Sequence, residues 1–299
     1  MLSSNPAPNV QLGQNGSVPV GGATGQVLTK TSNTDYDIQW SAGGASIVPG
    51  LVYGVQLSNN ATNPNTSIDF STGSATDDAL DATMTLSATL TKALNAAWAV
   101  GSNQGGLDTG TKANSTWYHV FLIQRSDTGV VDGLFSTSLA SPVMPTNYNR
   151  KRRLGSIRTD GSGNILAFVQ NGDTFLWAAP PVDVNASSVS TAGALSTMLI
   201  PVDVQVEGIF QSVFSGPGGT SSLVVISSPQ QNNVAPTSGS VSAITLALGS
   251  TSLISVNETR VRSNTSSQIR LRANASPAGI VLQVATLGWV DPRGRLGPQ

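Results

Sequence analysis

The 299-residue sequence is nearly neutral, with a formal net charge of −1 at pH 7, and only 10% of its residues are charged, against about 25% in a typical domain. Two glutamates and four lysines leave few exposed helix formers, and residues typical of turns and strands take their place. A mainly helical protein is excluded, and so is a disordered one, because 39% of the residues are hydrophobic.

The residue types that the chain lacks exclude several kinds of site. The absence of cysteine excludes disulfides, thiolate zinc sites and cysteine nucleophiles, and the single histidine, His119, excludes a multi-histidine metal site within one chain. We therefore expect no cofactor. No run of about 18 apolar residues and no signal-peptide pattern occur, so we expect no membrane insertion. The near-zero net charge argues against nucleic-acid binding by the whole chain.

Residues 1–18 show no hydrophobic periodicity and consist mainly of Pro, Asn, Gln and Gly, with isolated apolar residues. Such a segment cannot bury enough apolar surface to fold alone. We expect it to form an extended strap.

Residues 19–44 are typical of a hairpin, with two short strands at 25–31 and 36–40 on either side of a polar turn. Alternation places three side chains of the second strand on one face: Tyr36, Ile38 and Trp40. A hairpin of this size is marginal in water by itself. It is either an appendage of the main domain or, as we favour, a module completed by copies from neighbouring chains.

Residues 45–185 predict a β domain with one short helix. The segment 91–100 (TKALNAAWAV) is the only stretch in which Ala and Leu favour about two helical turns, and Gly101 would end it. A strand is expected at 117–123 (WYHVFLI), and the glycines of 161–164 (GSGN) indicate a hairpin turn.

Residues 186–299 contain short apolar runs at intervals of roughly 10–15 residues, separated by Gly, Pro, Ser and Asn. This spacing is typical of a β-sandwich or jelly roll. The predicted fold class is therefore all-β: an N-terminal strap and hairpin, followed by sandwich-like or jelly-roll-like domains with at most one short helix.

Three stretches of the chain resemble structural proteins of tailed-bacteriophage virions. GGATGQVLTKTSNTDYDIQW is similar to the GQVLTKxSxTDYDxxW module found near the N-terminus of phage fibre and head-fibre proteins. LTKALNAAWAVGSNQGGLDTG, with the stretch from WYHVFLIQRSDTG to RKRRLGSIRTDGSGNI, resembles a domain of phage and prophage structural proteins, and LGWVDPRGR fits the same group more loosely. The first two cover about residues 18–44 and 69–168, whereas residues 186–280 carry no resemblance.

The resemblance implies a homotrimer on the exterior of the virion, made in the bacterial host cytoplasm. Its N-terminus would attach to tail or capsid proteins, and its β domain would point outward. The strap would then be the virion anchor, with Asn9, Val10 and Leu12 as candidate contacts. The candidate trimer residues lie in the hairpin: Val27, Leu28, Tyr36, Ile38 and Trp40. Threefold association would also cover strand edges that few charges protect.

Histidine and aspartate are the candidates for catalysis or metal binding. His119 lies in an alternating strand, and no G-x-S-x-G elbow occurs, so we interpret it as a packed or hydrogen-bonded strand residue rather than a general base. The only acidic cluster consists of Asp69, Asp77, Asp78 and Asp81. It lacks the spacing of a calcium loop, and we interpret it as a solvated loop, with a metal site or a glycosidase carboxylate pair as alternatives.

The densest basic run is RKRR at residues 150–153. We interpret it as a solvated strand start or a set of inter-chain ion pairs. Contact with an anionic glycan or another virion protein is an alternative, and nucleic-acid binding is a further one.

Two Arg-x-Arg pairs, Arg260/Arg262 and Arg270/Arg272, each place both guanidinium groups on one face of a strand. Residues 263–267 could close the two strands into a hairpin, which would gather all four groups into one patch. Because a guanidinium binds carboxylate and phosphate in a planar fork, this patch is a candidate receptor or glycan site. A solvated face or inter-subunit ion pairs are the alternatives.

The function that these observations favour is non-enzymatic: a trimeric fibre or spike that is anchored by its N-terminus and presents a β domain to a host-surface glycan or receptor. One alternative is a capsid decoration or head-fibre protein whose main role is to bind the shell. A second alternative is a polysaccharide-degrading tail spike, for which the sequence offers no good residue set.

Overall fold

The computed structural model describes residues 19–34, 37–42, 47–216, 222–237, 244–247, 253–276 and 278–295. The chain divides into two compact units, Met1–Ile47 and Val48–Gln299, and each is described by itself. The candidate anchor residues Asn9, Val10 and Leu12 and the candidate trimer residue Tyr36 lie outside the described residues.

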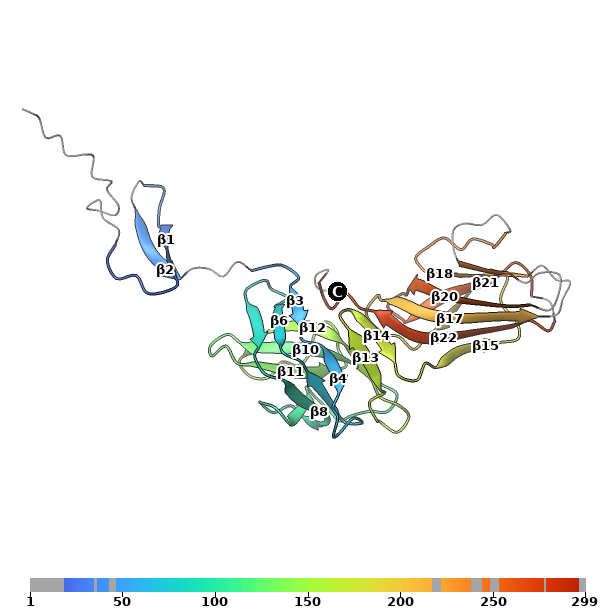
Figure 1. Cartoon of the computed structure of the whole chain (residues 1–299), viewed down its shortest axis with the longest axis horizontal. Coiled ribbons are helices and arrows are strands. Elements are labelled where there is room, and N and C mark those ends of the chain that lie inside the picture. Colours follow the sequence, from blue (N-terminus) through green and yellow to red (C-terminus); the bar gives the residue numbers. More distant parts are fainter. Residues whose placement is uncertain are drawn as a thin grey trace, which may run out of the picture. The chain divides into compact units, whose positions relative to one another are not determined.

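The first unit contains a two-stranded antiparallel sheet, β1 (Gln26–Lys30) and β2 (Ile38–Ala42), in which Leu28 lies opposite Trp40 (Figure 1). The indole Nε1 of Trp40 donates to the carbonyl of Pro19, which draws the segment before β1 back onto the sheet. Gly22 is required there, because a Cβ atom would lie 2.6 Å from the Trp40 ring.

The second unit is all-β: none of its described residues is helical. The part of the chain that the structure describes contains no helix that could span a membrane.

The largest sheet of the second unit has seven strands in the order β12 (Tyr148–Arg158), β10 (Trp117–Arg125), β11 (Val131–Ser136), β9 (Gln104–Leu107), β8 (Leu90–Ala97), β5 (Ser67–Phe70) and β4 (Leu57–Asn59). A three-stranded sheet contains β3 (Val52–Gly54), β6 (Gly73–Thr76) and β7 (Thr83–Leu86).

Two further sheets contain the C-terminal strands. The six-stranded sheet has the order β13 (Phe168–Asn171), β14 (Thr174–Trp177), β22 (Val281–Val290), β17 (Glu207–Gly216) and β20 (Leu253–Arg262), with β15 (Val182–Ala186) also paired to β22. The four-stranded sheet has the order β16 (Ala194–Thr197), β21 (Gln268–Ala273), β18 (Leu223–Ser227) and β19 (Ile244–Ala247). These two sheets lie one over the other (Figure 1). Buried side chains from both sheets belong to one hydrophobic core, among them Phe210, Phe214, Ile226 and Leu271. The six-stranded sheet therefore combines strands from the two segments that the sequence distinguishes: β13 and β14 come from residues 45–185, and β17, β20 and β22 come from residues 186–299.

The helix expected at residues 91–100 is wrong, because this segment contains strand β8. Leu90, Lys92 and Leu94 are buried and alternate with less buried residues, which is the period of a strand. Pairing with β5 on one side and β9 on the other outweighs the helical preference of Ala and Leu. The buried ammonium of Lys92 lies 3.1 Å from the Asp132 carboxylate and donates to the Ala99 carbonyl.

An aromatic cluster joins the seven-stranded and six-stranded sheets. Trp117 of β10 lies edge-on to Trp289 of β22, with their ring centroids 5.7 Å apart. Phe175 of β14 stacks on Trp289 at 5.2 Å. All three belong to one continuous hydrophobic core that extends across the second unit.

A C-terminal turn, residues Asp291–Arg295, follows β22 and binds β12. Both guanidinium nitrogens Nη1 and Nη2 of Arg153 lie 2.7 Å from the two Asp291 carboxylate oxygens. Arg293 donates to the carbonyls of Leu154 and Val55 at 3.0 and 2.6 Å. The end of the six-stranded sheet is thereby held against the edge of the seven-stranded sheet.

The basic run at 150–153 therefore binds other segments of the same chain. Arg152 and Arg153 are only 2% and 5% exposed; Arg152 donates to the carbonyls of Thr76 and Gly294. The expectation of a solvated strand start or inter-chain ion pairs is wrong for these two arginines. The reason is that the RKRR run lies opposite the C-terminal turn, a pairing that no local pattern in the sequence indicates.

We predict that Asp291→Asn lowers the free energy of unfolding by about 3–5 kcal/mol, because it leaves the buried Arg153 guanidinium without a counter-charge. Asp173→Asn is the matched control, since the ion pair of Asp173 with Arg295 is partly exposed and should contribute about 0–1 kcal/mol. Urea unfolding of both variants measures the difference. Equal losses would contradict the role assigned to the buried pair.

Candidate functional site

The residue types of a hydrolase triad occur together in the second unit. His119 on β10 is fully buried, and its Nδ1 lies 2.9 Å from the hydroxyl of Ser156. Asp203 lies 3.9 Å from the other ring nitrogen, Nε2. A Ser–His–Asp set of this kind activates a nucleophile only where substrate reaches the serine.

This cluster is closed to a substrate. Ser156 is 1% exposed, and its hydroxyl accepts a hydrogen bond from Arg153 Nη2 at 2.8 Å. The distance from His119 to Asp203 is too long for a hydrogen bond. The interpretation of His119 as a packed and hydrogen-bonded strand residue is confirmed.

The surroundings of His119 keep its ring neutral. Burial, and then the positive charge of Arg153, lower the pKa of His119 from 6.5 to about 3, although the Asp291 carboxylate opposes them. The imidazole is therefore uncharged at neutral pH.

The four aspartates do not form one site. Asp77 is 1% exposed, and its carboxylate accepts the backbone N–H groups of Asp81 and Ala82, which closes a turn. Asp78 pairs with Lys151, and Asp69 lies on β5. The solvated-loop interpretation is wrong for Asp77, because its carboxylate satisfies buried backbone groups. Within the described residues, no group of three or more His, Cys, Asp or Glu side chains could hold a metal ion.

The hairpin expected between the two Arg-x-Arg strands is wrong. β20 pairs with β17 in the six-stranded sheet, whereas β21 pairs with β16 and β18 in the four-stranded sheet. The Asn264 side chain accepts the N–H groups of Ser266 and Gln268, so the connection turns from one sheet into the other. Arg260 and Arg262 are exposed, with Arg260 lying 3.8 Å from Glu207.

Arg270 and Arg272 bind the backbone of the same chain. Arg270 donates to the carbonyls of Gln231 and Pro229 at 2.6 and 2.9 Å. Arg272 donates to the Asn233 carbonyl at 2.6 Å. These guanidinium groups hold the segment after β18 in place, so replacing both would loosen this segment whether or not a receptor binds here.

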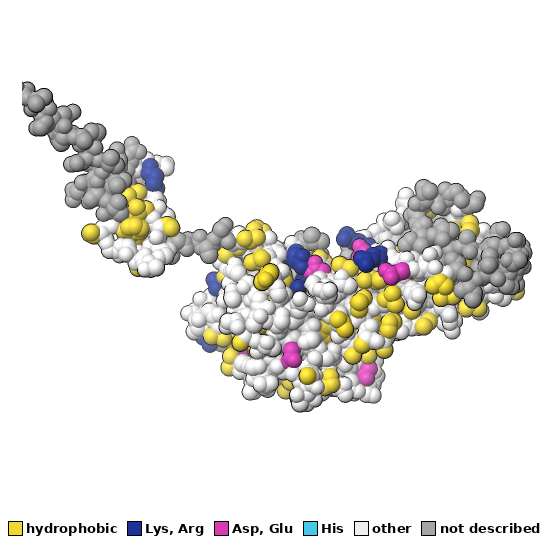
Figure 2. All heavy atoms as spheres, viewed as in Figure 1, with side chains coloured by type: hydrophobic (Ala, Val, Ile, Leu, Met, Phe, Trp, Pro, Cys, Tyr) yellow, Lys and Arg dark blue, Asp and Glu magenta, His cyan; other side chains and the backbone are white. Residues whose placement is uncertain are grey.

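The hairpin of the first unit leaves apolar side chains in contact with solvent. Val27 and Leu28 of β1 are 46% and 39% exposed, and Ile38 and Trp40 of β2 are half-buried. Figure 2 shows hydrophobic side chains gathered on the surface of this small sheet. A two-stranded sheet has no second layer of its own to cover them.

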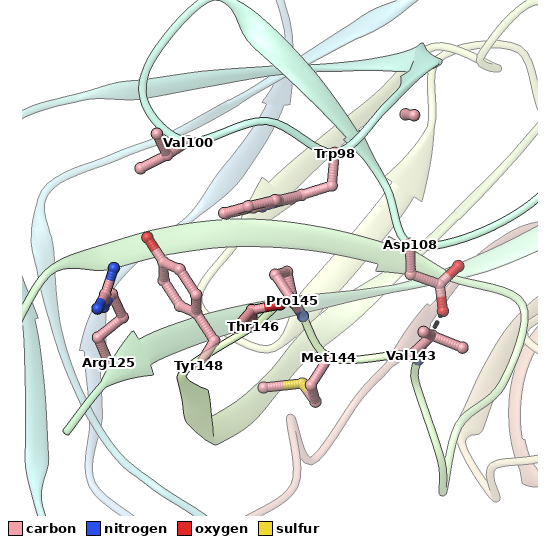
Figure 3. A pocket seen from close by; sticks show the side chains of 10 residues that line it. Trp98, Val100, Asp108, Arg125, Val143, Met144, Pro145, Thr146 and Tyr148 are labelled. Atoms are coloured by element: carbon pink, nitrogen blue, oxygen red, sulfur yellow. Dashed lines mark hydrogen bonds between the residues drawn. The ribbon is translucent and has the colours of Figure 1, made fainter. Parts of the chain in front are cut away.

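The second unit contains a cavity of about 460 Å³ beside the end of β8. Trp98 lies along it, and its Nε1 donates to the Gly133 carbonyl at 3.1 Å, which fixes the orientation of the ring. The Tyr148 ring meets the indole edge-on, with the centroids 5.0 Å apart. Its lining residues are Ala97, Trp98, Val100, Asp108, Arg125, Val143, Met144, Pro145, Thr146 and Tyr148 (Figure 3).

Polar groups lie at both ends of this cavity: Asp108 at one end, Tyr148 and Arg125 at the other (Figure 3). The Asp108 carboxylate accepts the Val143 N–H at 2.9 Å. The Tyr148 hydroxyl is buried and has no hydrogen-bond partner among the described residues, and burial raises its pKa. Arg125 forms two hydrogen bonds with Asp127, at 2.9 and 2.6 Å.

No pattern in the sequence predicts this cavity. Trp98 falls in the expected helix, and nothing in the sequence indicates a role for Asp108, Arg125 or Tyr148. The lining residues come from separate segments, and no spacing in the sequence indicates that they meet. The partial signal was an aromatic residue directly after an alternating stretch, in a chain with only five tryptophans.

A comparison with protein-family models finds no match for this chain, and a comparison with curated proteins finds none.

The neutral His119 predicts a pH-dependent stability. The unfolded chain takes up a proton near pH 6.5 and the folded chain only near pH 3, so the free energy of unfolding falls as the pH falls through this window. The slope should approach about 1.4 kcal/mol per pH unit. Urea unfolding between about pH 5 and 6.5 measures it, because there is only one histidine. His119→Gln should remove this slope; equal slopes for both proteins would contradict the assignment.

Proposed function

We propose that this chain is a non-enzymatic structural component of a tailed-phage virion, which assembles as a trimer, is anchored by its N-terminal segment and presents the second unit to the host surface. The observation that carries the proposal is the separate hairpin unit with exposed apolar residues. It coincides with the GQVLTKTSNTDYDIQW segment, which resembles the N-terminal module of fibre proteins.

The exposed apolar side chains of the hairpin favour association with copies of the same chain. Leu28 shares one face of the sheet with its cross-strand neighbour Trp40, whereas Val27 lies on the opposite face. The sheet buries little by itself, and each copy brings the same side chains. Packing such faces around an axis removes apolar surface from water, which is the main favourable contribution to association.

The packing of the second unit suits a rigid domain that is presented to the host surface without a change of conformation. Two of its ion pairs, Lys92–Asp132 and Arg153–Asp291, are buried, and so is His119; such buried polar contacts fix one packing arrangement. Its Ser–His–Asp cluster is closed to substrate, which supports a role in attachment over one in polysaccharide cleavage. Several copies per particle would raise the effective concentration of weak binding sites.

We predict that Val27→Asp with Leu28→Asp converts the trimer into a monomer, because the two substitutions place one charge on each face of the hairpin and therefore on whichever face forms the interface. Light scattering at micromolar concentration measures the mass, and the melting temperature of the second unit should not change. Val169→Asp is the matched control, as this valine is 61% exposed on β13. A monomeric unmodified protein, or a trimer that survives the double substitution, would contradict the proposal.

Particles test the remainder of the proposal. A tagged chain should appear on the exterior of purified virions, and excess purified protein should slow adsorption to host cells. A label on the head with no effect on adsorption would favour the shell-binding alternative. Absence of the chain from virions would overturn the proposed function.

A further inference from the structure

We infer that the cavity between Trp98 and Tyr148 binds one neutral sugar unit of a surface polysaccharide. The inference deepens the proposed function and rests on it, because it assigns host recognition to a site on the second unit. It gives this role to the cavity and not to the arginines of β20 and β21.

The shape and apolar lining of the cavity suit a single sugar ring. Its volume of about 460 Å³ lies within the range of small-molecule sites, which is about 300–1,000 Å³. Trp98 is only partly buried, although its Nε1 is already bonded to Gly133. The ring is therefore fixed while part of its surface lines the cavity. A pyranose has one face of C–H groups that can lie on such a ring.

The polar groups suit the hydroxyl rim of a sugar. The two Asp108 oxygens accept the N–H groups of Thr109 and Val143, at 2.7 and 2.9 Å. Each oxygen keeps a second lone pair, so the carboxylate can also accept from sugar hydroxyls. At the other end, Tyr148 carries a hydroxyl without a partner. A phenol hydroxyl can both donate and accept, so this group has the capacity to pair with a sugar hydroxyl.

The charges of the site favour a neutral ligand over an anionic one. Arg125 directs Nε and Nη2 at the Asp127 carboxylate, so its fork is occupied. Asp108 contributes a second carboxylate at the far end. Two carboxylates and one guanidinium leave one negative charge, which would repel an acidic sugar.

The small hydrophobic cluster beneath the cavity is packed without closing the cavity. Phe121, Ile123 and Leu134 form a small buried cluster with Tyr148, and the partly buried side chains of Trp98 and Met144 pack against it. Val100 and Val143 at the rim are 59% and 56% exposed. A packed core would have closed over these side chains.

Binding of methyl glycosides tests the inference. The probes are the methyl glycosides of glucose, galactose, mannose and rhamnose, with that of glucuronic acid as the anionic comparison. Ligand-observed NMR at millimolar concentration should detect at least one neutral glycoside and weaker binding of the glucuronide. Failure of all four neutral probes to bind the 299-residue chain would overturn the inference.

Three variants locate the binding. Trp98→Ala should weaken binding by about tenfold or more, whereas Trp98→Phe keeps an aromatic ring and should lose less. Tyr53→Ala removes a ring that is 75% exposed and outside the cavity, and should leave binding unchanged. Undiminished binding by a folded Trp98→Ala would overturn the inference.

Val143→Trp keeps the test decisive if Trp98→Ala fails to fold. This substitution is at an exposed position on the rim, and the larger side chain would fill the cavity. Binding should be lost while the melting temperature is unchanged; retained binding would overturn the inference. Virion incorporation is scored separately: glycoside failure with normal incorporation rejects this inference alone, whereas absence from virions rejects the proposed function.

Discussion

The bidentate ion pair between Arg153 and Asp291 is the interaction on which the second unit depends. Neither residue is more than 5% exposed, so each charge has lost its hydration and must be compensated within the protein. The geometry provides this: both carboxylate oxygens accept from the guanidinium, and the backbone N–H of Arg293 binds the same carboxylate at 2.8 Å. Burial raises the pKa of Asp291, but Arg153 outweighs it, and the pKa is lowered on balance.

The pair connects segments that are far apart in the chain. Arg153 is on β12, at the edge of the seven-stranded sheet, and Asp291 directly follows β22 of the six-stranded sheet. His119 lies beside Arg153 and its ring is neutral there, because it is buried and because an imidazolium would add a second cation. The stacked Trp289 and Phe175 close the apolar side of the same junction. Charge compensation and hydrophobic packing thus fix one arrangement of the two sheets.

The sequence predicted the fold class because that depends on composition and on local periodicity. Scarce Glu and Lys, with runs of aromatic and β-branched residues such as 117–123, were sufficient to predict an all-β chain. The helix at 91–100 was wrong because Ala and Leu carry little information about strand pairing. Arg153 and Arg270 are buried or bound through acceptors that lie more than 35 residues away in the sequence. The residues that line the Trp98 cavity also come from separate segments of the chain. Long-range contacts of this kind leave no spacing that a single sequence reveals.

Native-state hydrogen exchange of the 299-residue chain tests the central claim, that the buried ion pair makes the second unit one cooperative body. The slowest amides of β10 and β12 should open with the same free energy as those of β17 and β22. The amides of β1 and β2 should exchange at a separate free energy, because the hairpin belongs to another compact unit. If β10 and β12 opened at a free energy distinct from that of β17 and β22, the two sheets would be independent and the account would be contradicted.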